Sequence, residues 1–259
     1  MFFVGCDRAP APDARVAVLE QRVDALTARL ERVEQMLAVH GSAAPKAAHG
    51  AGPAPDPLAT YALDVSDDLF VGPAAALVTV VKAQDYACPF SAKAEPTMAQ
   101  LLARYPGKLR VVYKDLLTRP EESTVAAHAA CAAHRQGRFA AFNDALWTRA
   151  FAKDMSAAMM LTLARDLKLD VARFSTDMNG EACQQAVEND MRAIAAIGGG
   201  GTPTFYINGR HFTGAQPIEK FETLVDEELK KAEQRMGKDG VTAASYYQSV
   251  VVAGGRTTP

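Results

Sequence analysis

Two stretches of the chain decide its fold. Residues 86–91 read Tyr-Ala-Cys-Pro-Phe-Ser, and residues 201–210 read Gly-Thr-Pro-Thr-Phe-Tyr-Ile-Asn-Gly-Arg. A short apolar run at 77–81 precedes the first stretch and predicts a buried strand, and a helical pattern follows it to about residue 105. The second stretch contains two strand-like runs around an Asn-Gly turn, which is the signal of a β-hairpin. The two stretches therefore predict a mixed α/β fold.

The chain between and after these stretches completes the α/β pattern. The run at 109–113 predicts another strand, and residues 121 to about 197 predict a long block of helices. The sequence signals for breaks in this block are Gly137, Asp154, Asp170 and Gly180. A last helix is expected over 217–235. The sparse pattern of residues 237–259 predicts a disordered C-terminal tail, although residues 246–247 and 250–252 could instead add an edge strand.

Composition and charge exclude several classes of protein. The 259 residues include 28 Lys and Arg against 30 Asp and Glu, a net charge of −2. Nucleic-acid binders usually carry a strongly basic face, so we expect no nucleic-acid partner. No run approaches the roughly 18 apolar residues of a membrane-spanning helix. With 49% hydrophobic and 22% charged residues, the chain has the composition of a globular protein.

The first 57 residues have three distinct patterns. Residues 1–12 place Phe-Val-Gly before Cys6, which is similar to the end of a bacterial lipoprotein signal, although a fortuitous cysteine is the alternative. Residues 13–40 repeat Val and Leu at alternating spacings of three and four, which predicts a coiled-coil helix that joins two or three copies. The same helix could instead fold back on the globular domain. Residues 41–57 are rich in Ala, Pro and Gly, which is typical of a linker.

Cys88 lies where the first strand should end and the next helix should begin. The first N–H groups of a helix are unpaired, and the helix dipole places partial positive charge there. Both effects favour a thiolate over a thiol, so Cys88 is predicted to be an exposed nucleophile. Pro89 fits the first helical turn because no intrahelical bond needs its N–H. The alternative is a buried, inert cysteine.

Pro203 lies at the start of the first hairpin strand. A proline is tolerated there because the position needs no ladder donor. It suits a tight, cis peptide bond that leaves the preceding backbone free to meet a partner. An ordinary loop-to-strand proline is the alternative.

Together the two stretches resemble the DsbA-type thiol–disulfide oxidoreductases of the bacterial periplasm, which have a thioredoxin fold with a helical insertion. The resemblance covers about residues 60–235, so we expect this domain over 58–236 with its insertion at about 121–197. It implies that Cys88 is the attacking thiol and that Pro203 is the cis-proline facing it. It also implies that the Thr202 backbone pairs with an extended substrate. The substrate-binding residues would be Pro89, Phe90, Thr202 and Pro203.

Two residues depart from the family pattern. Ser91 stands where the family has its second cysteine, and Lys82 stands where an acidic residue is common. A lone thiol cannot store an intramolecular disulfide, but the Cys88 thiolate can attack a substrate disulfide and form a mixed disulfide. Release then needs a substrate thiol, glutathione or a membrane-bound reductant. Ser91 is predicted to assist by donating a hydrogen bond to the thiolate.

These inferences lead to one hypothesis and two alternatives. We expect a periplasmic protein, anchored through a lipidated Cys6, that exchanges disulfides of cysteine-containing proteins as an isomerase or reductase and not as a dithiol oxidase. The first alternative is a non-catalytic chaperone or scaffold that binds peptides on a degenerate thioredoxin fold. The second is a glutathione-dependent thioltransferase.

The remaining cysteines carry a structural prediction. Cys131 and Cys183 both lie in the helical block, and in an oxidising compartment they are expected to form a disulfide. Two free buried thiols are the alternative, because pairing cannot be read from sequence. His128 and His134 flank Cys131 at metal-like spacing, but a fourth ligand is not evident, so we expect no metal and no cofactor.

Overall fold

The structure is a computed structural model that describes residues 54–66 and 68–259. The predicted lipidation at Cys6, the coiled coil at 13–40 and most of the linker at 41–57 lie outside the described residues. The described residues form the α/β fold that the sequence predicts.

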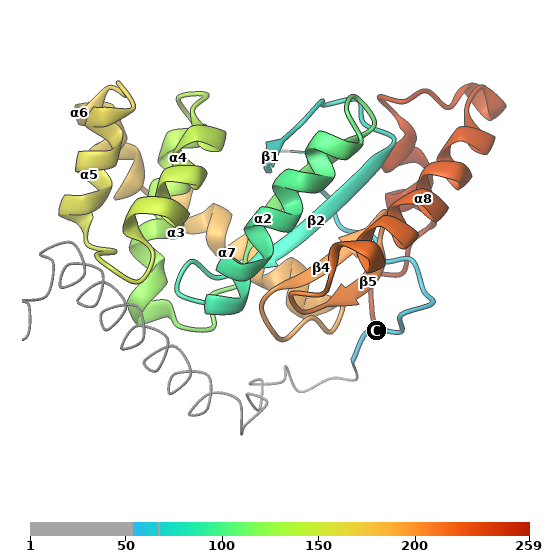
Figure 1. Ribbon diagram of the computed structural model, residues 1–259, viewed down its shortest axis with the longest axis horizontal. Coiled ribbons are helices and arrows are strands. Elements are labelled where there is room, and N and C mark those ends of the chain that lie inside the picture. Colours follow the sequence, from blue (N-terminus) through green and yellow to red (C-terminus); the bar gives the residue numbers. More distant parts are fainter. Residues whose placement is uncertain (1–53, 67) are drawn as a thin grey trace, which may run out of the picture. The chain divides into compact units, whose positions relative to one another are not determined.

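A five-stranded mixed sheet forms the centre of the fold (Figure 1). Its strands lie in the order β1-β3-β2-β4-β5, with β2 and β3 parallel and the other neighbours antiparallel. Strand β2 is buried along its whole length, so both of its faces lie in the core and its sequence does not alternate between apolar and polar residues. The five strands are β1 (Leu69–Val71), β2 (Val78–Gln84), β3 (Leu109–Asp115), β4 (Thr204–Ile207) and β5 (Arg210–Thr213).

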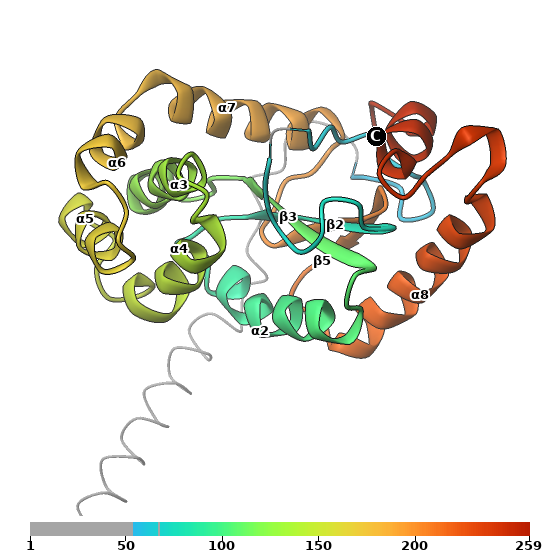
Figure 2. The same ribbon diagram turned by 90° about the horizontal axis from the view of Figure 1, so that it is seen from above.

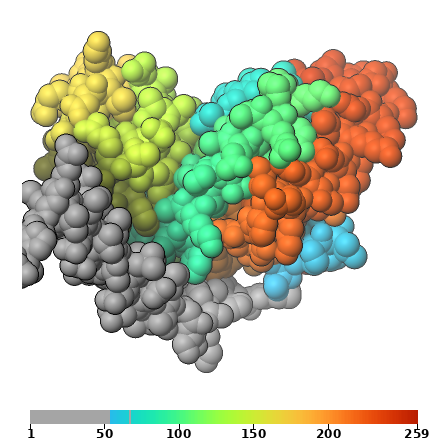
Figure 3. Space-filling model, in the orientation of Figure 1, coloured from blue at the N-terminus to red at the C-terminus, as the bar shows by residue number. Residues whose placement is uncertain are grey.

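Helices cover both faces of this sheet. Helices α2 (Pro89–Arg104) and α8 (Ile218–Arg235) lie side by side on one face, and α7 (Glu181–Ala196) lies on the other (Figure 2). Space-filling atoms show α2 and α8 as adjoining surfaces, with the helical block as a separate bulge beside α2 (Figure 3). The Tyr105 hydroxyl, just after α2, donates a 2.7 Å hydrogen bond to Asp226 of α8. This arrangement presents the N-terminal end of α2 at an edge of the fold.

The helical block, Pro120–Ala196, inserts between β3 and β4. The helix boundaries follow the predicted breaks. Gly137 adopts a left-handed φ of 68° after the first helix of the block, and the Asp170 side chain accepts the Arg173 N–H and so caps the helix that begins at Val171. A disulfide joins Cys131 in α3 to Cys183 in α7, with their Cα atoms 5.6 Å apart. The elements of the block are α3 (Pro120–His134), α4 (Phe139–Ala145), the π-helical turn η1 (Leu146–Ala150), α5 (Ala157–Asp166), α6 (Val171–Met178) and α7.

The C-terminal residues 237–259 are packed against the domain, so the predicted disordered tail is wrong. A 3₁₀ turn, η2 (Lys238–Gly240), and a π-helical turn, η3 (Tyr247–Val252), form here. Tyr247 is buried in the apolar cluster on the α7 face of the sheet. Arg256 exchanges backbone hydrogen bonds with residues 60 and 62 at 2.8 and 2.9 Å. The sequence did not predict order here because π-helical turns have neither of the two hydrophobic periods that identify helices and strands.

Candidate functional site

Cys88 is the N-cap residue of helix α2, as the sequence predicts. Its N–H donates a 2.9 Å hydrogen bond to the Asp85 carbonyl, and Pro89 occupies the first turn of the helix. The residue is only 7% exposed, so the expectation of an exposed thiol is corrected. Its sulfur lies against the polar backbone before Pro203, which partly shields it from solvent.

The segment around Pro203 faces the thiol. The Cys88 Sγ lies 3.3 Å from the Thr202 carbonyl oxygen, and the Thr202–Pro203 peptide bond is cis. Within the described residues, the N–H and carbonyl of Thr202 make no hydrogen bond to another backbone group. Apart from the contact with Cys88, this half-buried backbone therefore has unused hydrogen-bonding capacity beside the thiol.

Ser91 lies in the first turn of α2, but it does not have the predicted contact. Its side chain is fully buried, and its hydroxyl accepts a long, 3.4 Å hydrogen bond from the Asp85 N–H. In the part of the chain that the structure describes, no hydrogen bond joins Ser91 to Cys88. The expected Ser91–thiol bond is thus absent here, because the serine hydroxyl faces the end of β2.

Asp85 is a positioning residue that the sequence patterns did not predict. One carboxylate oxygen accepts the Ala87 N–H at 2.8 Å. The other accepts the N–H groups of Thr118 and Arg119, both at 2.7 Å, and the Thr118 hydroxyl at 2.8 Å. Asp85 therefore ties the loop that carries Cys88 to the start of the helical block. The available signal was an aspartate at the end of a strand, a residue type that often closes turns through its side chain.

Lys82 places a buried cation beneath the first turns of α2. Its side chain is fully buried, donates a 3.2 Å hydrogen bond to the Ser91 carbonyl and forms an ion pair with Glu95. The ammonium also lies 5.0 Å from the ring centre of Trp147. Burial lowers the pKa of Lys82, while the charges of Glu95 and Cys88 oppose this shift. The lysine that departs from the family pattern is therefore paired within the core.

The sequence profile of a family described as thioredoxin matches residues 64–227. The chain belongs to this thioredoxin family. Solved structures agree with the assignment. A thioredoxin-like oxidoreductase from Silicibacter pomeroyi DSS-3 superposes with a TM-score of 0.57 at 28% identity, over 64% of this chain and 94% of that one. BdbD from Bacillus subtilis, in its oxidised form, has a TM-score of 0.61 at 18% identity over 66% and 98% of the two chains, which shows the shared fold alone.

Curated relatives of this thioredoxin-family chain are much longer proteins. The Na(+)/H(+) antiporter NhaA of Herminiimonas arsenicoxydans is 33% identical over 153 residues, which are 59% of this chain and 24% of that protein. The antiporter NhaA 3 of Salinispora tropica is 34% identical over 165 residues, 63% of this chain and 25% of that protein. The chain thus spans about a quarter of the length of the curated relatives it matches. Among its described residues, no helix is both long and apolar enough to cross a membrane.

The surface beside the thiol is formed by the predicted substrate-binding residues of this thioredoxin domain. Pro89 and Phe90 are both exposed at the start of α2, and 44% of Phe90 is accessible to solvent. Pro203 is buried, and Thr202 is half-buried. An approaching polypeptide would therefore meet both an exposed aromatic ring and the Thr202 backbone beside Cys88.

Proposed function

We propose that this chain exchanges disulfides through Cys88 alone, by forming mixed disulfides with client proteins. The observation that carries this proposal is the position of Cys88, which is the one free thiol in the described part of the chain and lies at a helix N-terminus opposite Thr202. Family membership and the 28% identity to a thioredoxin-like oxidoreductase support the same chemistry. The match to the Na(+)/H(+) antiporters covers only about a quarter of those proteins, so it does not bear on this chemistry.

The first step is a thiol–disulfide exchange. The Cys88 thiolate attacks one sulfur of a client disulfide, a new S–S bond forms, and the client S–S bond breaks. The second client sulfur leaves as a thiolate and takes a proton from water. The client backbone pairs with Thr202 in this step, which holds its half-cystine next to the attacking sulfur.

The second step differs from that of a dithiol enzyme, because Ser91 supplies no resolving thiol. A different thiolate of the same client attacks the client sulfur of the mixed disulfide and releases Cys88, which rearranges the client's disulfides. When an external thiolate such as that of glutathione attacks the Cys88 sulfur instead, the client leaves as a thiolate and Cys88 carries the external thiol as a new mixed disulfide. A second external thiolate, or the second thiol of a membrane-bound dithiol reductant, then attacks that disulfide, which releases Cys88 and leaves the two external sulfurs joined. Isomerase or reductase activity follows, without dithiol oxidase activity.

We further propose a periplasmic location, with a lipid anchor at Cys6 and two or three copies joined through residues 13–40. The Cys131–Cys183 disulfide supports an oxidising compartment. A periplasmic thioredoxin-like protein from Salmonella enterica has the same fold, with a TM-score of 0.55 at 20% identity. Mass spectrometry of the processed N-terminus and the solution mass of wild type against Leu26→Pro test these two elements. An unacylated N-terminus or a monomeric wild type would contradict them.

A second candidate is a peptide-binding scaffold without redox activity. The low exposure of Cys88 and the high exposure of Phe90 favour this alternative, since a binding surface needs no accessible sulfur. Reactivation of scrambled ribonuclease, compared between wild type and Cys88→Ala, distinguishes the two. Disulfide exchange predicts that only wild type accelerates reactivation, whereas a scaffold predicts equal rates. Glutathione release from a glutathionylated peptide tests the thioltransferase alternative in the same pair of proteins.

A further inference from the structure

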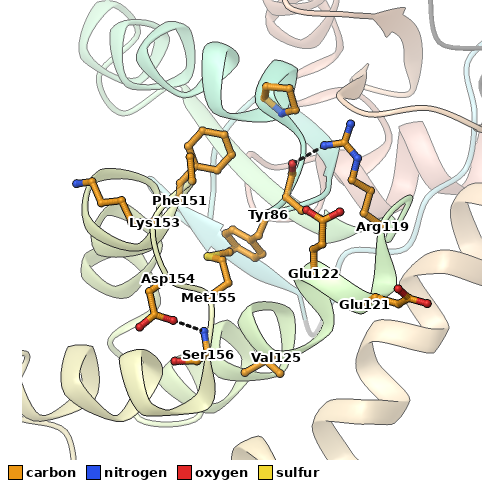
Figure 4. A pocket seen from close by; sticks show the side chains of 13 residues that line it. Tyr86, Arg119, Glu121, Glu122, Val125, Phe151, Lys153, Asp154, Met155 and Ser156 are labelled. Atoms are coloured by element: carbon orange, nitrogen blue, oxygen red, sulfur yellow. Dashed lines mark hydrogen bonds between the residues drawn. The ribbon is translucent and has the colours of Figure 1, made fainter. Parts of the chain in front are cut away.

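A cavity of about 630 Å³ lies next to the loop that carries Cys88 (Figure 4). Ala87 and Pro89, the two chain neighbours of Cys88, form part of its wall. Val125 of α3 and Phe151 of the loop after η1 line other sides. The cavity therefore joins the proposed exchange site to the helical block, and its volume falls in the range of ordinary ligand pockets.

The base of this cavity is apolar and rigid. The ring of Tyr86, which lines the cavity, packs on Trp147 with 4.9 Å between ring centres, and Trp147 packs on Phe151 at 5.6 Å. The Tyr86 hydroxyl and the Trp147 ring N–H both donate to the side-chain oxygen of Asn143, at 2.8 and 3.2 Å. Because both polar ends are satisfied inside the protein, these rings form a fixed apolar backing behind the cavity, and the half-buried Phe151 extends this backing to the cavity wall.

The rim of the cavity carries an excess of negative charge. Three carboxylates (Glu121, Glu122 and Asp154) and two cations (Arg119 and Lys153) line it. Each cation already donates to a backbone carbonyl, at 2.8 and 3.3 Å. Glu121 and Glu122 are exposed and form no ion pair with any described residue. The rim is thus complementary to a positively charged group.

We propose that this cavity is a client subsite, which takes an apolar side chain of the client polypeptide while a basic neighbour meets Glu121 and Glu122. This inference rests on the proposed function, since the occupant belongs to the polypeptide whose disulfide reaches Cys88. The walls at Ala87 and Pro89 place the subsite within a few client residues of the half-cystine. The client residues that flank a cystine and fit the subsite therefore decide whether Cys88 attacks that cystine.

Synthetic peptides test the subsite directly. Each carries one cysteine activated as a 2-thiopyridyl disulfide, so release of thiopyridone reports capture of the peptide by Cys88. The peptides differ only in one pair of residues near the cysteine, which is Leu-Lys, Ala-Ala or Leu-Glu. Each pair is tested once before the cysteine and once after it. We expect wild type to capture the Leu-Lys peptide about tenfold faster than the Ala-Ala peptide. The Leu-Glu peptide should be about threefold slower than Leu-Lys, because its charge is repelled.

Variants at the surface assign the preference to the cavity. Val125→Asp places a charge on the exposed apolar wall and should remove the advantage of Leu over Ala. Glu121→Gln combined with Glu122→Gln should remove the advantage of Lys over Glu and leave that of Leu. Glu181→Gln, in the exposed first turn of α7 and outside the cavity, is the matched control and should change neither preference.

A second readout separates the subsite from the redox proposal. Fluorescence anisotropy of Cys-to-Ser peptides on Cys88→Ala measures binding without any exchange, and the same order of affinities is expected. Equal affinities and equal capture rates for the three peptides would overturn the subsite, while exchange at Cys88 would stand. Thiopyridone release no faster with wild type than with Cys88→Ala would overturn the proposed function, and the anisotropy order would still decide the subsite.

Discussion

The Cys88 sulfur donates to the carbonyl oxygen of Thr202 at 3.3 Å, although 114 residues separate the two in sequence. A thiolate has no proton to donate, so this bond must open when Cys88 ionises. The carbonyl is then free to accept an N–H from an extended client. Ionisation of Cys88 therefore also releases the Thr202 carbonyl for pairing with a client.

Ser91→Cys should restore resolution of the mixed disulfide within the protein. A thiol one helical turn after Cys88 would compete with external thiols at high effective concentration, so the lifetime of the mixed disulfide should shorten about tenfold or more. Quenched samples analysed by mass spectrometry measure this lifetime. Ser91→Ala is the control and should behave as wild type. An unchanged lifetime in Ser91→Cys would contradict the monothiol mechanism.

Asp85→Asn should destabilise the domain and slow exchange at Cys88. An amide has a single acceptor oxygen, so the variant could not accept the N–H groups on both sides of the side chain, and about 2–4 kcal/mol of unfolding free energy should be lost. Urea unfolding measures the loss. Asp170→Asn is a matched control, because asparagine caps a helix as well as aspartate does, and its cost should stay below about 0.5 kcal/mol. Similar costs for both variants would refute the positioning role.

Glu95→Gln should be more damaging than removal of the whole ion pair. Glu95 balances the charge of Lys82, whose side chain is fully buried, and its loss should cost about 3–5 kcal/mol of unfolding free energy. Lys82→Met combined with Glu95→Leu removes both charges and should cost less than Glu95→Gln alone. Urea unfolding of the three proteins tests this order. A double variant that is the least stable would show that the pair itself is stabilising.

Asp68 should make the stability of the domain fall as pH rises. Burial raises the pKa of Asp68 to about 6, against the attraction of Lys114, with which it forms a 2.6 Å ion pair. The folded state therefore binds more protons than the unfolded state between the ordinary value of 3.8 and about 6. The stability of wild type relative to Asp68→Asn should fall by about 1–3 kcal/mol across this window.

Asp64→Asn is the control for this pH dependence. Hydrogen bonds from Ser66 and Gln248 lower the pKa of Asp64, so its contribution has the opposite sign. That contribution is present above the unfolded pKa and is lost as pH falls. Parallel stability curves for wild type and Asp68→Asn would show that Asp68 titrates as an ordinary carboxyl.

The sequence predicts most of the fold because the relevant signals are local. Two apolar runs and the Asn-Gly hairpin signal predict four of the five strands, and Gly137 and Asp170 mark ends of helices through their own backbone and side chain. Strand β1 was missed because its three residues are too few to show a period. The C-terminal residues were mispredicted because their burial depends on the distant surface that they cover.

The site is predictable only where its residues contact others that are close to them in the sequence. The position of Cys88 at a helix start follows from the adjacent Pro89 and the preceding strand. Asp85 could not be assigned in this way, because its partners at Thr118 and Arg119 lie 33 and 34 residues away. The sequence did not predict the cavity either, because its walls come from three segments that are far apart in the chain.

The central claim is that Cys88 by itself attacks disulfides, and its most direct test is the intact mass of the protein after brief exposure to a disulfide-bonded peptide. Exchange at Cys88 should add one peptide half to the wild-type protein, attached at Cys88 and removed by dithiothreitol. This mechanism also predicts no addition to Cys88→Ala, and an unchanged wild-type mass after exposure to the reduced peptide. No added mass on the wild-type protein, or equal addition to wild type and Cys88→Ala, would contradict disulfide exchange through Cys88.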